Sequence, residues 1–555
     1  MKLRRARCGF SNKLAGMNRV SAVAFCAAPP TRSERDTALS KRFVLLARRS
    51  IDNVMRRGGT ARLGVFVAIY SFCAGCGLAH AQSREHTLPA AVKTRLQAAA
   101  IPDTAFTAIA LRLADGRVMY SNNANAALQP ASTLKVLTSI VALDALGPAH
   151  RGRVEFRSAG EIRDGALQGD LVIRGLANPD FDANALRSVL AKLSHQGIND
   201  IRGDVILDRH FFVPARTDIG LPPFDETPEF RYNVIPDALM LGSNLHSLEI
   251  SSTDSALRIS ANPALPGVRF ESSLTLVDGS CTDWEDTWQL PTVTTHSGGD
   301  VVVKLNGQYP KHCSINTAIN VLDRTLYADR LIRAIWSERG GRIVGVVRDA
   351  TTGTDANSTR LLTQHESRTL AEFNRDIVKR SDNPITRLTY LTLGAQSDST
   401  RLTTSERAEA VVRRWLVKHR IDATGLVLDN GSGLSRSERI TAITLAEVLR
   451  VGHQSVWAPE FMAMFPIVGV DGGMRNRLLE SGVTGRARLK TGTLRNTMAL
   501  AGFVPDASGQ THAVVTIVNH DLAIAKVGRP IIDAMIDWIA KTDLRTLNPD
   551  APARQ

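Results

Sequence analysis

The chain has 555 residues, of which 43% are hydrophobic, enough for more than one domain and for a sizeable core. Its formal net charge of +14 would favour an acidic partner such as a nucleic acid, but the charge is unevenly distributed. Residues 1–81 hold 15 of the 68 Lys and Arg residues and 3 of the 54 Asp and Glu residues. Residues 82–555 therefore hold 53 basic and 51 acidic residues, a net charge of +2, and no nucleic-acid partner is expected.

The first elements along the chain have the three parts of a secretory signal. Residues 55–62 are basic, residues 63–78 are apolar, and Ala79-His80-Ala81 offers a small-x-small site that predicts cleavage before Gln82. The apolar run is too short and too rich in Gly for a stable membrane span, so an exported chain is expected. Residues 1–54 are interpreted as a disordered upstream extension, with Met55 as the true start; an unusually long signal is the alternative.

Cysteine usage agrees with export. Four of the six cysteines precede Gln82, and the Cys73-Ala74-Gly75-Cys76 spacing inside the apolar run is attributed to chance. The remaining pair, Cys281 and Cys313, is expected to form a disulfide, which would contribute about 3 to 4 kcal/mol in the chain-entropy description. Two free thiols are the alternative.

After the signal, residues 107–113 and 118–121 flank an Ala-Asp-Gly turn and predict a β-hairpin. Pro130 then precedes Ala131-Ser132-Thr133-Leu134-Lys135, which opens a helical apolar pattern that ends at Gly147.

Ser132 and Lys135 are three positions apart, so on a helix they share one face and the amine can reach the hydroxyl. A serine becomes an effective nucleophile when a neighbouring base takes its proton. The amine must then be neutral, and lowering its pKa from about 10.4 to near 7 requires about 4 to 5 kcal/mol of bias against the ammonium. Burial beside a second cation gives a shift of that sign. The pair alone is a weak signal, because Ser-x-x-Lys is frequent by chance.

Residues 153–348 form a block rich in short alternating runs and turns, typical of β-structure. One helix is predicted at residues 183–193, and Trp284 and Trp288 are interpreted as packing residues. The predicted strands are residues 154–156, 171–174, 205–207, 248–250, 268–270 and 301–303.

Beyond this block the pattern becomes helical and then returns to strands. Helices are predicted at residues 366–380, 384–393, 405–419, 441–451 and 530–541. Strands are predicted at residues 487–490, 498–504 and 512–519. The simplest organisation is one catalytic domain, residues 82–152 and 349–555, interrupted by a β-rich insertion, residues 153–348.

Two more short motifs follow Ser132-x-x-Lys135 in chain order. They are Ser381-Asp382-Asn383, after a predicted helix, and Lys490-Thr491-Gly492, at the end of a predicted strand and followed by Thr493. Together the three motifs resemble the signature of penicillin-recognising serine enzymes.

The long intervals between the motifs, and the β-rich insertion, narrow this resemblance. They are similar to class C low-molecular-mass penicillin-binding proteins, the D-alanyl-D-alanine carboxypeptidase/endopeptidases of the penicillin-binding protein 4 type. The resemblance covers residues 86–541, with one conservative departure at Phe465-Pro466-Ile467-Val468. Other matching stretches are Gly169-Asp170-Leu171, Lys379-Arg380, Asp429 to Arg436, Gly469-Val470-Asp471-Gly472 and Leu500-Ala501-Gly502-Phe503.

This resemblance implies an α+β fold, with a transpeptidase-like domain of antiparallel sheet and helices plus a helical cluster. It implies a periplasmic serine DD-peptidase that acts on peptidoglycan stem peptides and is acylated by β-lactams. Lys490, Thr491 and Thr493, with Gly492 between them, would bind the substrate carboxylate, since a cation and two hydroxyls suit that group. No cofactor is implied, and the thirteen histidines show no spacing typical of a metal site.

The same resemblance assigns the remaining roles. Ser381 would relay the proton to the leaving amine, Asn383 would hold the substrate amide, and Lys490 would help to keep Lys135 neutral. The backbone N–H groups of Ser132 and Thr493 would form an oxyanion hole.

Two alternatives to the peptidase remain open. A serine β-lactamase would start the same reaction but deacylate quickly, although the long insertion argues against it. A non-catalytic wall-binding protein would have no need of the full set of reactive side chains. The glycine-rich stretch from Asp429 to Arg436 is interpreted as a tight structural loop near the site, and not as a source of reactive groups.

Overall fold

The computed structural model describes residues 85–220, 225, 227–351, 358–397 and 401–547. The chain divides into two units, Met1–Gln82 and Ser83–Gln555, and the description below concerns the second. The predicted upstream extension, signal and cleavage point therefore lie outside the described residues. No helix among the described residues is long and apolar enough to cross a membrane.

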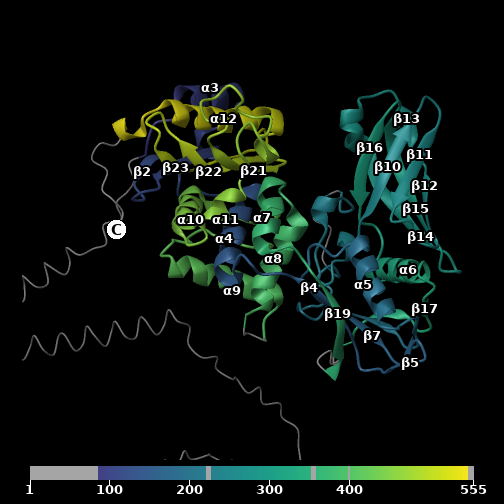
Figure 1. Ribbon diagram of the computed structural model, residues 1–555. Coiled ribbons are helices and arrows are strands. Elements are labelled where there is room, and N and C mark those ends of the chain that lie inside the picture. The colour runs from purple at the N-terminus through teal and green to yellow at the C-terminus, as the bar shows by residue number, and fades with distance from the viewer. Residues whose placement is uncertain (1–84, 221–224, 226, 352–357, 398–400, 548–555) are drawn as a thin grey trace, which may run out of the picture. The chain divides into compact units, whose positions relative to one another are not determined.

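A five-stranded antiparallel sheet joins the two ends of the described chain in the order β2-β1-β23-β22-β21 (Figure 1). Alternate residues of each strand point to opposite faces, and both faces are covered. Ile109 and Ile517 face the helical cluster, whereas Ala108 and Val518 face α3 and α12. The strands are β1 (Phe106–Arg112), β2 (Val118–Asn122), β21 (Arg488–Leu494), β22 (Thr497–Pro505) and β23 (Thr511–Asn519), and the covering helices are α3 (Ala90–Ala98) and α12 (Ala525–Lys541).

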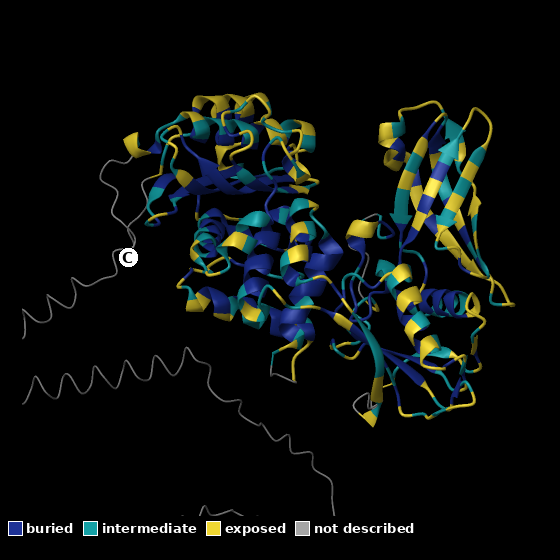
Figure 2. Ribbon diagram, viewed as in Figure 1, coloured by how far each residue is buried: buried dark blue, intermediate teal, exposed yellow. Residues whose placement is uncertain are grey.

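The strands of this sheet are buried between helical layers, as Figure 2 shows. Residues 498–504 of β22 are wholly apolar, and residues 513–518 of β23 contain one polar residue, Thr516, because neither face of these strands meets water. The predicted strands in this region and the α+β fold class are confirmed. The final helix begins at Ala525, five residues before the predicted start.

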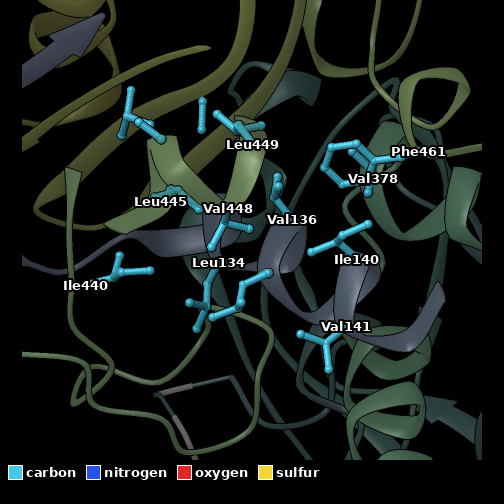
Figure 3. Close-up of a cluster of buried hydrophobic side chains, with 14 of the residues drawn as sticks. Leu134, Val136, Ile140, Val141, Val378, Ile440, Leu445, Val448, Leu449 and Phe461 are labelled. Atoms are coloured by element: carbon cyan, nitrogen blue, oxygen red, sulfur yellow. The ribbon is translucent and has the colours of Figure 1, made fainter. Parts of the chain in front are cut away.

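A second layer of helices surrounds α4 (Lys135–Leu146), which follows a 3₁₀ turn at Ala131–Leu134. Every residue of α4 from Lys135 to Leu143 is buried. Figure 3 shows Val136, Ile140 and Val141 of this helix among side chains of the surrounding elements. The other helices are α7 (Leu370–Lys379), α8 (Asn383–Ala395), α9 (Thr404–Lys418), α10 (Ala442–Gln454) and α11 (Ala458–Ala463).

A mixed five-stranded sheet in the order β18-β9-β7-β4-β19 begins in the β-rich block and continues past residue 348, the predicted end of that block. Its last strand, β19, pairs with its first, β4, so the chain leaves the sheet beside the strand by which it entered. The division into an inserted region, residues 153–348, and a split catalytic domain stays a proposal. The strands are β4 (Arg153–Ser158), β7 (Leu171–Leu176), β9 (Val205–Asp208), β18 (Val347–Asp349) and β19 (Arg360–Glu366).

The rest of the block has smaller sheets and two helices. One sheet has the order β11-β10-β16, and another joins β12, β13 and β14 to β15. Trp284 and Trp288 are buried in the core of this block, as predicted, and Cys281 and Cys313 are joined by a disulfide. The strands are β10 (His246–Ser252), β11 (Leu257–Asn262), β12 (Val268–Ser272), β13 (Thr275–Val277), β14 (Trp288–Thr295), β15 (Val301–Pro310) and β16 (Ser314–Ile319), and the helices are α5 (Ala183–His195) and α6 (Arg324–Ser337).

Two predictions in this part of the chain were wrong. The block has two described helices where one was predicted, because the charged residues of α6 obscured its apolar face. The helix predicted from Glu366 begins at Leu370, since Thr369 and Glu372 form a capping box and the preceding residues pair as β19.

Candidate active site

The predicted nucleophile lies in the 3₁₀ turn that leads into the central helix. Ser132 is partly exposed and lines a cavity of about 940 Å³. Lys135 begins α4 one helical turn later and is fully buried. The Lys135 Nζ lies 2.9 Å from the Ser132 Oγ, so the helical spacing brings the two groups together as predicted.

The other contacts of Lys135 decide how its amine is oriented. Its Nζ donates to the Asn383 Oδ1 at 2.6 Å and to the Ser432 backbone carbonyl at 2.6 Å. Both partners can only accept, so a neutral amine uses its two N–H groups on them. Its lone pair is then left to accept the hydroxyl proton of Ser132. The geometry thus fits a base directed at the serine.

Burial is the main reason that this amine can be neutral near physiological pH. Burial lowers the pKa of Lys135 to about 7, against the charges of Glu438 and Asp382, which raise it. The cation that also lowers the pKa of Lys135 is Arg387 on α8. From the sequence, Lys490 was expected to have this effect. Burial also lowers the pKa of Lys490, and the charge of Lys135 lowers it further.

The second and third motifs meet at one contact. The Lys490 Nζ, which is buried, donates to the Ser381 Oγ at 2.9 Å and to the Thr491 carbonyl at 2.8 Å. Ser381 has a φ of 61° and precedes Asp382, which caps α8 by accepting from the Ile385 N–H. A backbone turn and a helix cap therefore place Ser381 at the cavity, which it lines.

The strand that carries the third motif is the edge strand β21, beside the nucleophile turn. Gly492 permits this approach, because a Cβ there would lie 2.8 Å from the Pro130 carbonyl. Thr493 is exposed and lines the cavity, whereas Thr491 and Gly492 do not. The cavity thus brings together Ser132, Ser381, Asn383 and Thr493.

The loop from Asp429 to Arg436 packs against the nucleophile turn, and its Leu434 and Arg436 line the cavity. Gly433 has a φ of +76°, and a Cβ there would lie 1.7 Å from the Ala131 carbonyl. The Gly431 carbonyl accepts from the Thr138 Oγ1 at 2.6 Å. The loop agrees with its structural interpretation, but it also supplies the Ser432 carbonyl to Lys135. Sequence reasoning missed this contact because a backbone carbonyl has no residue signature.

A Gly433→Ala variant tests this close packing. The added methyl collides with backbone and must adopt a left-handed conformation, so we expect a loss of at least about 2 kcal/mol in the free energy of unfolding. Urea titrations of the variant and the parent measure this loss. Gly509→Ala is the matched control, since Gly509 also has a positive φ but open space around it. Equal losses for the two variants would contradict the packing argument.

The β-rich block also contributes to the cavity, which no motif indicated. Asp225 and Tyr232 line it, and the Tyr232 carbonyl accepts from the Asn383 Nδ2 at 3.0 Å. Arg231 forms an ion pair with Asp382 at 2.9 Å. Asn383 is therefore held between Lys135 and a segment about 150 residues away in the sequence.

No group of three or more His, Cys, Asp or Glu side chains among the described residues is arranged to hold a metal ion. The chemistry available at the cavity is that of two serines, two buried lysines and an amide. The arrangement can activate one hydroxyl and place a cation and hydroxyls opposite it.

Comparison with known proteins agrees with this geometry. The D-Ala-D-Ala carboxypeptidase 3 (S13) family matches residues 88–542, which contain all three motifs. The chain belongs to this family. The family predicted from the motifs is confirmed, and this S13 protein is a serine D-Ala-D-Ala carboxypeptidase.

Relatives of this S13 carboxypeptidase match most of its length. A D-alanyl-D-alanine carboxypeptidase of Actinomadura sp. (strain R39) is 26% identical over 416 residues, 73% of this chain and 76% of the relative. The carboxypeptidase DacB of Haemophilus influenzae is 27% identical over 418 residues, 74% of this chain and 84% of the relative. The crystal structure of penicillin binding protein 4 from H. influenzae has the same fold, with a TM-score of 0.67 at 24% identity, covering 81% of this chain and 99% of that one.

Proposed function

We propose that this S13 carboxypeptidase removes the terminal D-alanine from peptidoglycan stem peptides through an acyl-enzyme on Ser132, and that it also opens D-Ala cross-links. The observation that supports this is the 2.9 Å contact between the Lys135 Nζ and the Ser132 Oγ, with both N–H groups of the neutral amine engaged elsewhere. A serine held in this way is poised to attack a carbonyl.

In the first half-reaction Lys135 takes the proton of the Ser132 hydroxyl as the oxygen bonds to the carbonyl carbon of the D-Ala-D-Ala bond. The backbone N–H groups of Ser132 and Thr493 stabilise the oxyanion, a contribution of about 3 to 4 kcal/mol per donor in other acyl transferases. The C–N bond then breaks, and the proton that Lys135 took is passed through the Ser381 hydroxyl to the leaving amine. A water molecule then attacks the ester carbonyl and gives its proton to Lys135. Lys135 returns this proton to the Ser132 oxygen as the ester C–O bond breaks.

The substrate carboxylate binds Thr493 at the cavity wall and lies near the buried Lys490, whereas Thr491, which the resemblance also implied, does not line the cavity. A negative charge beside Lys490 favours its ammonium form and so offsets the burial that lowers its pKa. Asn383 holds the substrate amide, with its Nδ2 exchanging the Tyr232 carbonyl for the substrate carbonyl. Substrate binding therefore rearranges contacts that are already present.

The same proposal predicts the cellular location of the protein and the class of compound that inhibits it. The predicted signal at residues 55–81 would deliver the protein to the periplasm, where its peptide substrate is found. β-Lactams carry a strained amide and would acylate Ser132 in place of the peptide. A solved structure of H. influenzae penicillin binding protein 4, 23% identical to this chain, is a complex with a β-lactam.

Labelling with a fluorescent penicillin tests the proposal. We expect a stable adduct on the parent, no adduct on Ser132→Ala, and D-alanine release from a D-Ala-D-Ala peptide by the parent only. Ser139→Ala is the matched control, because Ser139 is a buried serine on the same helix without a hydrogen-bond partner among the described residues. This control should label like the parent.

Each other outcome assigns a different function. Rapid loss of the label from the parent, with turnover of the penicillin, would indicate a β-lactamase. Absence of an adduct on the folded parent would indicate a wall-binding protein without catalysis. Equal labelling of the parent and Ser132→Ala would show that the nucleophile lies elsewhere.

A further inference from the structure

Glu438 is a fully buried carboxylate two residues after the loop that packs against the nucleophile turn. Its Oε1 accepts three backbone N–H groups, from Gly431 at 2.8 Å, Asn430 at 3.1 Å and Asp429 at 3.3 Å. Its Oε2 has no hydrogen-bond partner among the described residues. One side chain therefore closes the turn from residue 429 to 431, although no motif had singled it out.

This turn leads directly to the catalytic lysine. The Gly431 carbonyl accepts from Thr138 on α4, and the next carbonyl, of Ser432, accepts from the Lys135 Nζ at 2.6 Å. The Ser432 carbonyl is one of the two acceptors that fix the N–H groups of this amine. A shift of the turn would therefore rotate the amine and move its lone pair away from Ser132.

Glu438 also acts on Lys135 by its charge. It is the largest charge effect on this lysine, and it favours the ammonium form. Asp382 adds to it, whereas Arg387 opposes it, and Lys490 on β21 is a further cation coupled to Lys135. Glu438 therefore counteracts part of the burial that makes the lysine a base.

Glu438 itself has other charged or titratable neighbours. They are Asp429 on its own loop and Arg387 and Tyr390 on α8. Burial raises the pKa of Glu438 to about 7, although its three backbone donors lower it. Glu438 therefore carries its negative charge mainly in the upper part of the pH range over which Lys135 loses its proton.

We propose that Glu438 is a positioning residue for acylation: its carboxylate holds the turn that directs the Ser432 carbonyl at Lys135, and its charge sets the lower pH limit of the reaction. This inference rests on the proposed role of Lys135 as the base. It assigns a function to a residue that neither touches the substrate nor lines the cavity.

A Glu438→Gln variant separates the two effects, because the amide oxygen still accepts from the turn while the charge is lost. The rate of acylation by a fluorescent penicillin is measured against pH. Without the carboxylate the ammonium of Lys135 is less stable, so the midpoint of the acid limb moves to lower pH. Near the parent midpoint the variant should acylate faster than the parent, and the two profiles should converge at lower pH, where Glu438 of the parent is itself protonated.

Glu480→Gln is the matched control for the substitution itself, since Glu480 is an exposed carboxylate and is not among the charges that act on Lys135 or Glu438. Its acid limb should coincide with that of the parent. An unchanged midpoint in Glu438→Gln would overturn the electrostatic part of the proposal. A parent that is not labelled at any pH would instead refute the proposed function, and this inference with it.

A Glu438→Asp variant tests independently whether Glu438 positions the Ser432 carbonyl. The same variant keeps this part of the proposal testable if Glu438→Gln does not fold. It keeps the charge but is one methylene shorter, so it cannot reach the three N–H groups without moving the turn. We expect the plateau rate to fall about tenfold or more, with a midpoint close to that of the parent. A plateau rate equal to that of the parent would overturn the positioning role.

Discussion

We expect a Lys135→Met variant to be acylated by penicillin about 10³-fold more slowly than the parent, or slower still. Methionine has nearly the same length but offers no lone pair of comparable basicity. Among the described residues the Ser132 Oγ hydrogen bonds only to the Lys135 Nζ, so no other group is placed to take its proton. Loss of a general base costs about 10²- to 10⁴-fold, and groups that act as one unit reach the upper end of that range. Pseudo-first-order labelling rates give the comparison.

The variant should still fold, but the Asn383 Oδ1 and the Ser432 carbonyl lose a buried donor, which costs about 1 to 3 kcal/mol for each unsatisfied group. Its thermal midpoint should therefore fall below that of the parent while unfolding stays cooperative, and acylation is compared at a temperature at which both proteins are folded. Lys418→Met is the matched control: the Lys418 Nζ binds Asp144 at 2.9 Å on the surface, and its loss should leave acylation unchanged. Acylation of Lys135→Met within tenfold of the parent would refute the assignment of the base.

An Asp237→Asn variant should lose about 3 kcal/mol or more of unfolding free energy. The Asp237 Oδ2 accepts from the Arg209 Nε at 2.9 Å and from the Arg324 Nη1 at 2.8 Å, and all three side chains are buried. Removing this charge takes from each guanidinium its fully buried carboxylate partner and leaves only the less buried Asp349 for Arg209 and Asp218 for Arg324. Breaking a buried pair in this way costs about 3 to 5 kcal/mol in comparable sites. Urea titrations followed by circular dichroism measure the change.

This ionic cluster also supports the cavity wall. Asp237 lies five residues after Tyr232, whose backbone carbonyl accepts from Asn383. If the loss of Asp237 displaces this segment, Asn383 loses that contact, so acylation of Ser132 should slow as well. Asp278→Asn is the control, because Asp278 pairs with Lys311 but its side chain is 91% exposed, and such pairs contribute less than about 1 kcal/mol. Equal stability of the two variants would contradict the assigned role of the cluster.

The sequence predicted those parts of the fold in which local pattern and burial agree. The helix after Pro130, the strands at residues 498–504 and 512–519, and the hairpin near the start all have a clear periodicity. The prediction failed where local signals conflicted. The charges of α6 hid its apolar face, and β19 was not predicted because strand pairing with β4 is not visible in local sequence; only its last residue, Glu366, lay inside the predicted helix.

For the candidate site, the motifs identified the side chains but not all of their partners. The sequence placed Ser381, Asn383 and Lys490 near the nucleophile through a family resemblance, and the structure brings each into a hydrogen bond with another residue of the set. It had no means of finding Glu438 or Tyr232, which act through backbone groups.

By itself the sequence determined the contact between Ser132 and Lys135, because two side chains three positions apart on a helical turn lie on the same face whatever surrounds them. Only the tertiary structure decided that this lysine is a base. Asn383 and the Ser432 carbonyl, which fix its N–H groups, lie 248 and 297 residues further along the chain. Burial, which lowers its pKa to about 7, depends on helices packed around α4 from several separate segments. A pKa is set by solvent exclusion and by neighbouring charges in space, neither of which local spacing can specify.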